Sequence, residues 1–237
     1  MADSLPLQPR LRAIAQLVPS SCRRLADIGT DHGYIPVELL LTGRADFAVA
    51  ADIGAEPLDH ARRTARQYGV ADGIDFRLGD GLAVLSPGEV DAVIVAGMGG
   101  DNIAAILSAA PWTREGVLLL LQPMSKAETL RAFLPENGYA VLGERLVQDK
   151  GVLYPILTVR GGDMPPATPA QAWGGFLLEE DPLWGTYLQD RLLRLRKAAA
   201  GLERARDPAM ARRREQFLNV IVQLTERKEA WDHAHRT

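Results

Sequence analysis

Residues 25–36, LADIGTDHGYIP, place two aspartates, a histidine and a tyrosine in the turn that follows an apolar run. Gly29 and Gly33 in this turn allow the backbone to approach a ligand closely, because glycine has no Cβ. Their G-x-x-x-G spacing differs from the G-x-G-x-x-G of dinucleotide sites, where pyrophosphate binds at the start of a helix. Asp27 and Asp31 would repel such a phosphate. The turn therefore predicts a ligand that carries no phosphate at this position.

Two further acidic residues follow the next apolar segments. Asp52 comes 25 residues after Asp27, where an acidic side chain can accept hydrogen bonds from the hydroxyls of a ribose. Asp80 lies in a Gly-Asp-Gly triplet, where it can accept a hydrogen bond from an adenine amino group while Gly81 frames the ring. Each signal also has a plainer interpretation, because Asp52 suits a helix cap and Gly-Asp-Gly suits a turn.

The combination of these features is more specific than any one of them, and it predicts S-adenosylmethionine. The methionine part of this donor carries an ammonium group that Asp27 or Asp31 can pair with, and its sulfonium is positively charged. A turn that repels phosphate and attracts cations fits such a donor.

Short apolar strands that alternate with helical patterns position these residues. The predicted strands cover residues 24–28, 47–52, 74–78, 92–96 and 117–122, and the predicted helices cover 10–17, 36–41, 58–68, 102–109 and 126–137. This alternation is typical of a parallel sheet covered on both faces. Two longer strands over 139–147 and 152–160, joined by a short link, predict an antiparallel hairpin. The whole resembles the methyltransferase variant of the doubly wound α/β sheet, in which ligands bind beyond the carboxyl ends of the strands.

A second region follows the sheet. Residues 160–175 are dense in Gly and Pro and predict a linker. Two helical patterns then begin with Asp-Pro at Asp181 and Asp207, where aspartate suits an N-cap and proline suits the first turn. Their apolar stripes consist of Leu188, Leu192 and Leu195 on the first helix and Phe217, Val220, Ile221 and Leu224 on the second. We expect an antiparallel helical hairpin, for which a packing role alone is the plainer interpretation.

Composition limits the classes of protein that this chain can belong to. The 237 residues are 47% hydrophobic, which is ample for a buried core. One cysteine, Cys22, excludes an intramolecular disulfide and fits a reducing compartment. We find no signal-peptide pattern and no apolar run of membrane-spanning length, and therefore expect a cytoplasmic protein with no membrane association. The formal charge is −5 over residues 1–163 and +2 over residues 164–237, so a negative partner would be attracted to the second region.

Six stretches of the chain form one recognisable pattern. They are RLRAIAQLVP, LADIGTDHGYIPVELL, RLGDGLAVL, GEVDAVIVAGMGG, LLLQPM and LRAFLPENGYAVLGERLV. Together, from about Arg10 to Arg160, they closely resemble the bacterial TrmK family, the tRNA (adenine-22-N1)-methyltransferases. The resemblance implies an S-adenosylmethionine-binding methyltransferase domain over residues 1–163 and a coiled-coil-like helical domain over residues 170–237 that contacts tRNA.

The resemblance also implies roles for individual residues. The donor-binding residues are expected to be Asp27, Gly29, Asp31, His32, Gly33, Asp52, Ile53, Asp80, Gly81, Ala96, Gly97 and Met98. Gly99, Gly100, Gln122 and Pro123 are expected to face the incoming base, and Arg10, Arg12, Arg191 and Arg194 to contact RNA. We expect a monomer with no metal site, since the four histidines are scattered along the sequence.

The predicted acceptor, adenine N1, has an in-plane lone pair and needs no deprotonation, so positioning supplies most of the rate. N1 lies on the Watson–Crick edge, so the base must be unpaired or flipped out. Among the predicted catalytic residues, Asp31 stabilises positive charge or orients the amino group, and Tyr34 borders the donor and the acceptor. His32 assists proton departure or makes a loop hydrogen bond.

Two other functions stay open at this point. A small-molecule methyltransferase would share the fold and the donor site. A non-catalytic RNA-binding protein of the same fold would not need the complete donor motifs that this chain has. The Asn/Asp-Pro-Pro-aromatic signature of enzymes that methylate exocyclic amines is missing from the sequence, which favours a ring nitrogen as the acceptor.

Overall fold

The computed structural model describes residues 5–204 and 207–235 and divides into two compact units. The first unit extends to Pro166 and the second starts at Ala167, between the ends predicted for the two domains. No helix in the described part of the chain has the length and apolar character needed to cross a membrane.

One sheet of seven strands forms the centre of the first unit, in the order β3-β2-β1-β4-β5-β7-β6. The strands are β1 (Arg24–Ile28), β2 (Phe47–Asp52), β3 (Ile74–Leu78), β4 (Ala92–Gly99), β5 (Leu118–Ser125), β6 (Tyr139–Asp149) and β7 (Val152–Gly161). Strands β1 to β5 are parallel, and β7 pairs antiparallel with both β5 and β6. The predicted fold is confirmed, and the strand order reverses between β1 and β4, which places the ligand-binding switch point there.

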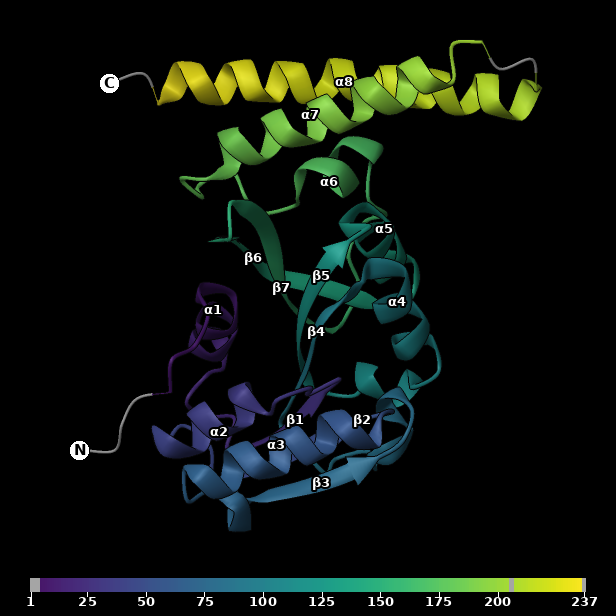
Figure 1. Cartoon of the computed structure of the whole chain (residues 1–237). Coiled ribbons are helices and arrows are strands. Elements are labelled where there is room, and N and C mark those ends of the chain that lie inside the picture. The colour runs from purple at the N-terminus through teal and green to yellow at the C-terminus, as the bar shows by residue number, and fades with distance from the viewer. Residues whose placement is uncertain (1–4, 205–206, 236–237) are drawn as a thin grey trace. The chain divides into compact units, whose positions relative to one another are not determined.

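Five helices cover the two faces of this sheet (Figure 1). They are α1 (Pro9–Leu17), α2 (Tyr34–Leu41) and α3 (Ala55–Gln67) on one face and α4 (Gly100–Ser108) and α5 (Ala127–Glu136) on the other. Because both faces are covered, the central strands are largely apolar, and Val93, Ile94 and Val95 of β4 are fully buried. Their carboxyl ends therefore emerge from a rigid core.

Strand β4 differs from its predicted span over residues 92–96. It continues to Gly99 because its pairing with β5 shifts register around Gly97, which has a φ of +82°. A bulge inserts one extra residue and bends the strand, and glycine adopts the left-handed backbone that this requires. The bulge places Gly97 and Met98 at the switch point.

The second unit contains α6 (Pro169–Gly174), α7 (Trp184–Gly201) and α8 (Pro208–Ala234). The prediction of a linker over residues 160–175 is wrong at both ends, since β7 extends to Gly161 and α6 begins at Pro169. Helix α6 is stabilised by a capping box, in which Thr168 and Gln171 exchange side-chain and backbone hydrogen bonds. The prediction of a linker relied on the Gly and Pro content of this segment and overlooked the capping box.

The prediction for α8 is confirmed, because Asp207 caps the helix by accepting a hydrogen bond from the Ala209 amide at 2.8 Å. The prediction for Asp181 is wrong. Its carboxylate accepts a hydrogen bond from the Leu183 amide at 2.9 Å, in a turn that precedes the helix, and α7 begins at Trp184.

Helices α7 and α8 pack as an antiparallel pair. Trp184, the first residue of α7, packs edge-on against Trp231 near the end of α8, with ring centroids 6.5 Å apart. The predicted apolar stripes lie in this interface, where Leu188, Leu192, Leu195, Val220 and Leu224 are buried. The predicted helical hairpin is therefore confirmed.

Candidate active site

The turn after β1 is held in an unusual backbone conformation. Gly29, Asp31 and Gly33 all have positive φ, at +72°, +49° and +68°. Amides 29 and 30 both donate to the Ala51 carbonyl, at 2.8 and 3.0 Å, so the turn is tied to β2. Aspartate is one of the few residues other than glycine that enter the left-handed region, and strain of this kind is concentrated at functional sites.

Asp27 is buried at the end of β1. Its side chain is 4% exposed, and Thr30 Oγ1 donates a hydrogen bond of 2.7 Å to its Oδ2. The pKa of Asp27 is raised to about 6, chiefly by burial; the Thr30 hydrogen bond opposes this rise, and the nearby Asp52 carboxylate adds to it. A cation bound beside Asp27 would therefore stabilise the ionised carboxylate that burial disfavours.

Two cavities meet at the switch point. The first, here named the acidic cavity, has a volume of about 420 Å³ and contains Asp27, Asp31 and His32 in its wall. The remaining lining residues are Gln8, Arg10, Leu11, Gly29, Thr30, Tyr34, Ile35, Ala96 and Gly97. Of the residues that α1 and the segment before it supply to this wall, Arg10 was predicted as an RNA contact, whereas Gln8 and Leu11 were not predicted.

The second, here named the apolar cavity, has a volume of about 450 Å³ and shares Gly29, Ala96 and Gly97 with the first. The other lining residues are Ile28, Asp52, Ile53, Gly79, Asp80, Gly81, Met98, Asn102, Ala105 and Ile106. The last three come from one face of α4 and were not predicted, although their i, i+3 and i+4 spacing is a recognisable signal.

Asp52 lies on the wall between the turn and the apolar cavity. Its Oδ2 accepts a hydrogen bond from the Asp31 amide at 3.3 Å, and its Oδ1 accepts one from the Gly54 amide at 2.9 Å. Each carboxylate oxygen keeps a second lone pair that can accept from a ribose hydroxyl. Asp52 thus orders the turn and the loop before α3 and still lines the apolar cavity.

The apolar cavity combines apolar side chains with one exposed carboxylate. Ile53 is 73% exposed at its rim, and Met98 and Ile106 add apolar surface. Asp80 is exposed beside them and can accept a hydrogen bond from an amino group. A planar aromatic ring with one amino group could pack against the apolar side chains and donate a hydrogen bond to Asp80.

Gln122 supports the bulge, and the prediction that it faces the incoming base is wrong. The Gln122 side chain is fully buried, and its Oε1 accepts hydrogen bonds from Arg10 at 2.7 Å and from the Gly97 amide at 3.2 Å. The second bond satisfies an amide at the bulge. Pro123 is also buried, so neither residue is exposed to a base.

Two predicted glycines serve packing. A Cβ on Gly100 would lie 2.2 Å from the Lys126 carbonyl oxygen, and one on Gly33 would lie 2.9 Å from Ala61 Cβ of α3. Both glycines are buried. They permit close approach between elements of the fold, whereas Gly29 and Gly97 line the cavities.

The predicted RNA-binding arginines fall into two groups. Arg12 is exposed, and so is Arg194, which pairs with Asp190 at 3.0 Å. Arg10 is 15% exposed and binds Gln122 inside the first unit. Arg191 is 11% exposed and lies over the Tyr187 ring at 4.9 Å, so it is a packing residue and not the surface residue that the prediction requires.

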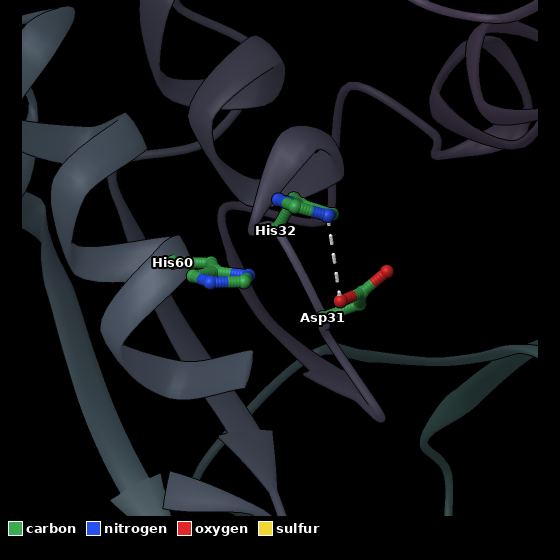
Figure 2. Close-up of side chains that lie close together, drawn as sticks. All are labelled: Asp31, His32 and His60. Carbon is green, nitrogen blue, oxygen red and sulfur yellow. Dashed lines mark ion pairs between the residues drawn. The ribbon is translucent and has the colours of Figure 1, made fainter. Parts of the chain in front are cut away.

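His60 was not predicted, and the structure brings it to His32. The two imidazole rings are stacked, with centroids 4.9 Å apart and planes within 16°, and Figure 2 shows both beside Asp31. Ligand atoms of these three side chains lie within 4.8 Å of one another. Imidazole lone pairs lie in the ring plane, however, so two nearly parallel stacked rings do not direct them at one metal ion.

Comparison with known proteins identifies the family. Residues 7–157 match the model of a methyltransferase domain family. The chain is 35% identical to the tRNA (adenine(22)-N(1))-methyltransferase of Bacillus subtilis over 187 residues, which cover 78% of this chain and 76% of the relative.

Solved structures agree with this similarity. The crystal structure of the B. subtilis m1A22 tRNA methyltransferase TrmK is 30% identical, with a TM-score of 0.77, and the match covers 97% of this chain and 98% of that one. A Streptococcus pneumoniae protein solved with S-adenosyl-L-methionine is 27% identical, with a TM-score of 0.80 and coverage of 92% and 98%. The chain therefore belongs to the bacterial TrmK family of tRNA (adenine-22-N1)-methyltransferases.

Proposed function

We propose that this protein transfers a methyl group from S-adenosylmethionine to N1 of adenine 22 in tRNA. The observation that carries the proposal is the pair of joined cavities, one containing a buried acid beside a phosphate-repelling turn and the other apolar with one exposed acid. A donor with a cationic end and an adenosine end matches this division. The choice of tRNA and of adenine 22 rests on the similarity to the B. subtilis enzyme.

The residues present fit the donor. Asp27 would pair with its ammonium group, because a neighbouring cation offsets the burial that raises the Asp27 pKa to about 6. Asp52 would accept hydrogen bonds from the ribose hydroxyls, and Asp80 one from the adenine amino group. Ile53 and Ile106 would contact the adenine ring.

The chemistry needs little from the protein beyond placement. Bound S-adenosylmethionine supplies an electrophilic methyl group, which adenine N1 accepts with its in-plane lone pair as the bond to sulfur breaks. Asp31 is 69% exposed in the acidic cavity, where its carboxylate can stabilise the positive charge that develops on the base. His32 and Tyr34 in the same wall orient the base, and His32 Nε2 lies 3.7 Å from Asp31 Oδ1.

RNA binding would use exposed arginines of both units. Arg12 belongs to the first unit and Arg194 to the second, and phosphate contacts of this kind position an RNA without reading its sequence. Gly99, the last residue of β4, stays a predicted contact of the base. We expect the protein to act as a monomer in the cytoplasm, where tRNA is modified.

The test is to map methylated nucleotides after the full-length protein is incubated with tRNA and labelled donor. We expect 1-methyladenosine at position 22 alone, and no product on a matched tRNA with guanine at that position. Methylation at another atom or nucleotide would contradict the proposal. Salt-insensitive transfer to a nucleoside, with no product on tRNA, would favour the small-molecule alternative, since tRNA binding through phosphates weakens with salt.

A further inference from the structure

His32 is the shared partner in two ring contacts. It stacks with Tyr34 at a centroid distance of 5.3 Å and a plane angle of 14°, and with His60 at 4.9 Å and 16°. Tyr34 and His32 both line the acidic cavity, whereas His60 comes from α3. The His32 ring in the wall of the acidic cavity is therefore in contact with a side chain of α3, an element that does not line this cavity.

The backbone around this contact is closely packed. Gly33, the residue after His32, approaches Ala61, the residue after His60, so closely that a Cβ on the glycine would lie 2.9 Å from the alanine Cβ. Helix α3 is thus fixed against the turn at the point where the two imidazoles meet. His60 is half-buried and lies within the regular part of the helix.

The His32 ring has few other restraints. Its side chain is 43% exposed, and its Nε2 lies 3.7 Å from Asp31 Oδ1, which is too long for a hydrogen bond. An exposed imidazole rotates freely about its side-chain torsions unless its faces are in contact. The two stacking partners, Tyr34 and His60, therefore determine which way Nε2 points, and Figure 2 shows His60 beside the His32 ring.

We propose that His60 is a positioning residue for methyl transfer, which holds the His32 imidazole by stacking so that its Nε2 faces Asp31 in the acidic cavity. The inference rests on the proposed function, because the cavity is taken as the place where the base reacts. It requires the ring of His60 and not its nitrogens.

The first experiment compares full-length wild-type protein with His60→Ala and His60→Phe, and uses Gln67→Ala, at the other end of α3, as the matched control. Alanine favours a helix more than histidine, so His60→Ala should fold. We expect kcat on tRNA to fall about three- to tenfold in His60→Ala, since a ring pair contributes about that factor. The donor Kd from calorimetry should stay within about twofold, and His60→Phe should restore kcat to within about twofold of wild type.

Two results of this experiment would overturn the inference. Wild-type kcat in His60→Ala would show that the contact does not affect the reaction. Equal losses in His60→Phe and His60→Ala would show that the His60 nitrogens matter, as they would for a proton carrier or a metal ligand.

The second experiment needs neither donor nor RNA. The chain has four histidines, so the His32 ring protons can be assigned in an NMR spectrum by comparison with His32→Gln. We expect these resonances to move downfield in His60→Ala, as ring-current shielding is lost, and to return upfield in His60→Phe. Unchanged resonances in His60→Ala would overturn the stacking contact.

The two experiments separate this inference from the proposed function. If the wild-type protein binds donor but methylates no tRNA, the proposed function is wrong, and with it the predicted effect of His60 on methyl transfer. An active wild type with an equally active His60→Ala variant would defeat the positioning role alone.

Discussion

The acidic cavity and the apolar cavity share three residues and are built by opposite means. The wall of the acidic cavity is a turn with three left-handed residues, a buried carboxylate and exposed polar side chains. The wall of the apolar cavity is one face of α4 and the ends of β2 and β3, in ordinary backbone conformations apart from its glycines. The left-handed non-glycine residue Asp31 and the buried carboxylate of Asp27 thus both lie on the side where we place the chemistry.

This contrast divides the expected effects of substitutions. Changes in the acidic cavity should act on kcat or on the pH dependence of donor binding. Changes in the apolar cavity should act on donor affinity alone, since apolar contacts are equal before and during the transfer.

Asp31→Asn should have the largest effect. Asparagine tolerates the positive φ of Asp31, +49°, whereas alanine would add backbone strain to the loss of the carboxylate. We expect kcat to fall about 100-fold, as for loss of a group that stabilises developing charge, with an unchanged melting temperature. The measurement is single-turnover methylation of tRNA, with Asp72→Asn, another exposed aspartate, as the control. Near-normal turnover would remove Asp31 from its assigned role.

Asp27 should make donor binding depend on pH. Its pKa is raised to about 6, so the carboxyl loses its charge as the pH falls through 6 and can no longer pair with an ammonium group. We expect donor affinity measured by calorimetry to drop about tenfold from about pH 7.5 to about pH 5. Asp27→Asn should bind weakly at both pH values, with the pH dependence largely lost. An equal pH dependence in that variant would assign the titration to another group.

The same carboxyl affects the stability of the free protein with the opposite sign. Because its pKa is higher in the folded chain than the ordinary 3.8, the folded state binds more protons than the unfolded state between pH 3.8 and about 6. The contribution of Asp27 to the free energy of unfolding therefore decreases as the pH rises through this window. Donor binding at neutral pH offsets that loss.

Ile106→Ala should have the smallest effect and act on the other cavity. The change removes apolar surface from the α4 face without adding a charge, so we expect the donor Kd to rise about three- to tenfold while kcat at saturating donor stays near the wild-type value. Calorimetry and steady-state kinetics measure the two quantities. A fall in kcat with an unchanged donor Kd would contradict the assignment of the apolar cavity to donor affinity alone.

Local signals in the sequence were enough to predict most of the sheet and the acidic residues around the donor site. The predicted spans of β1, β2 and β3 agree with the observed strands at both ends, because Gly follows β1 and β3 directly and Asp ends β2. Asp27 and Asp52 lie at the ends of β1 and β2 and Asp80 follows β3, and parallel strands bring their carboxyl ends to one edge. The strand positions and the placement of these aspartates could therefore be predicted from hydrophobic periodicity and from position along the chain.

Only the tertiary structure decided which residues face a cavity and which support it. Gln122 is buried because Arg10, 112 positions earlier, donates to it, and it in turn binds the amide of the Gly97 bulge. Arg191 is buried by the packing of its own helical unit. His60 reaches His32 because α3 packs against the turn at Gly33. Such contacts depend on the pairing of distant segments, which no local pattern of residue types contains.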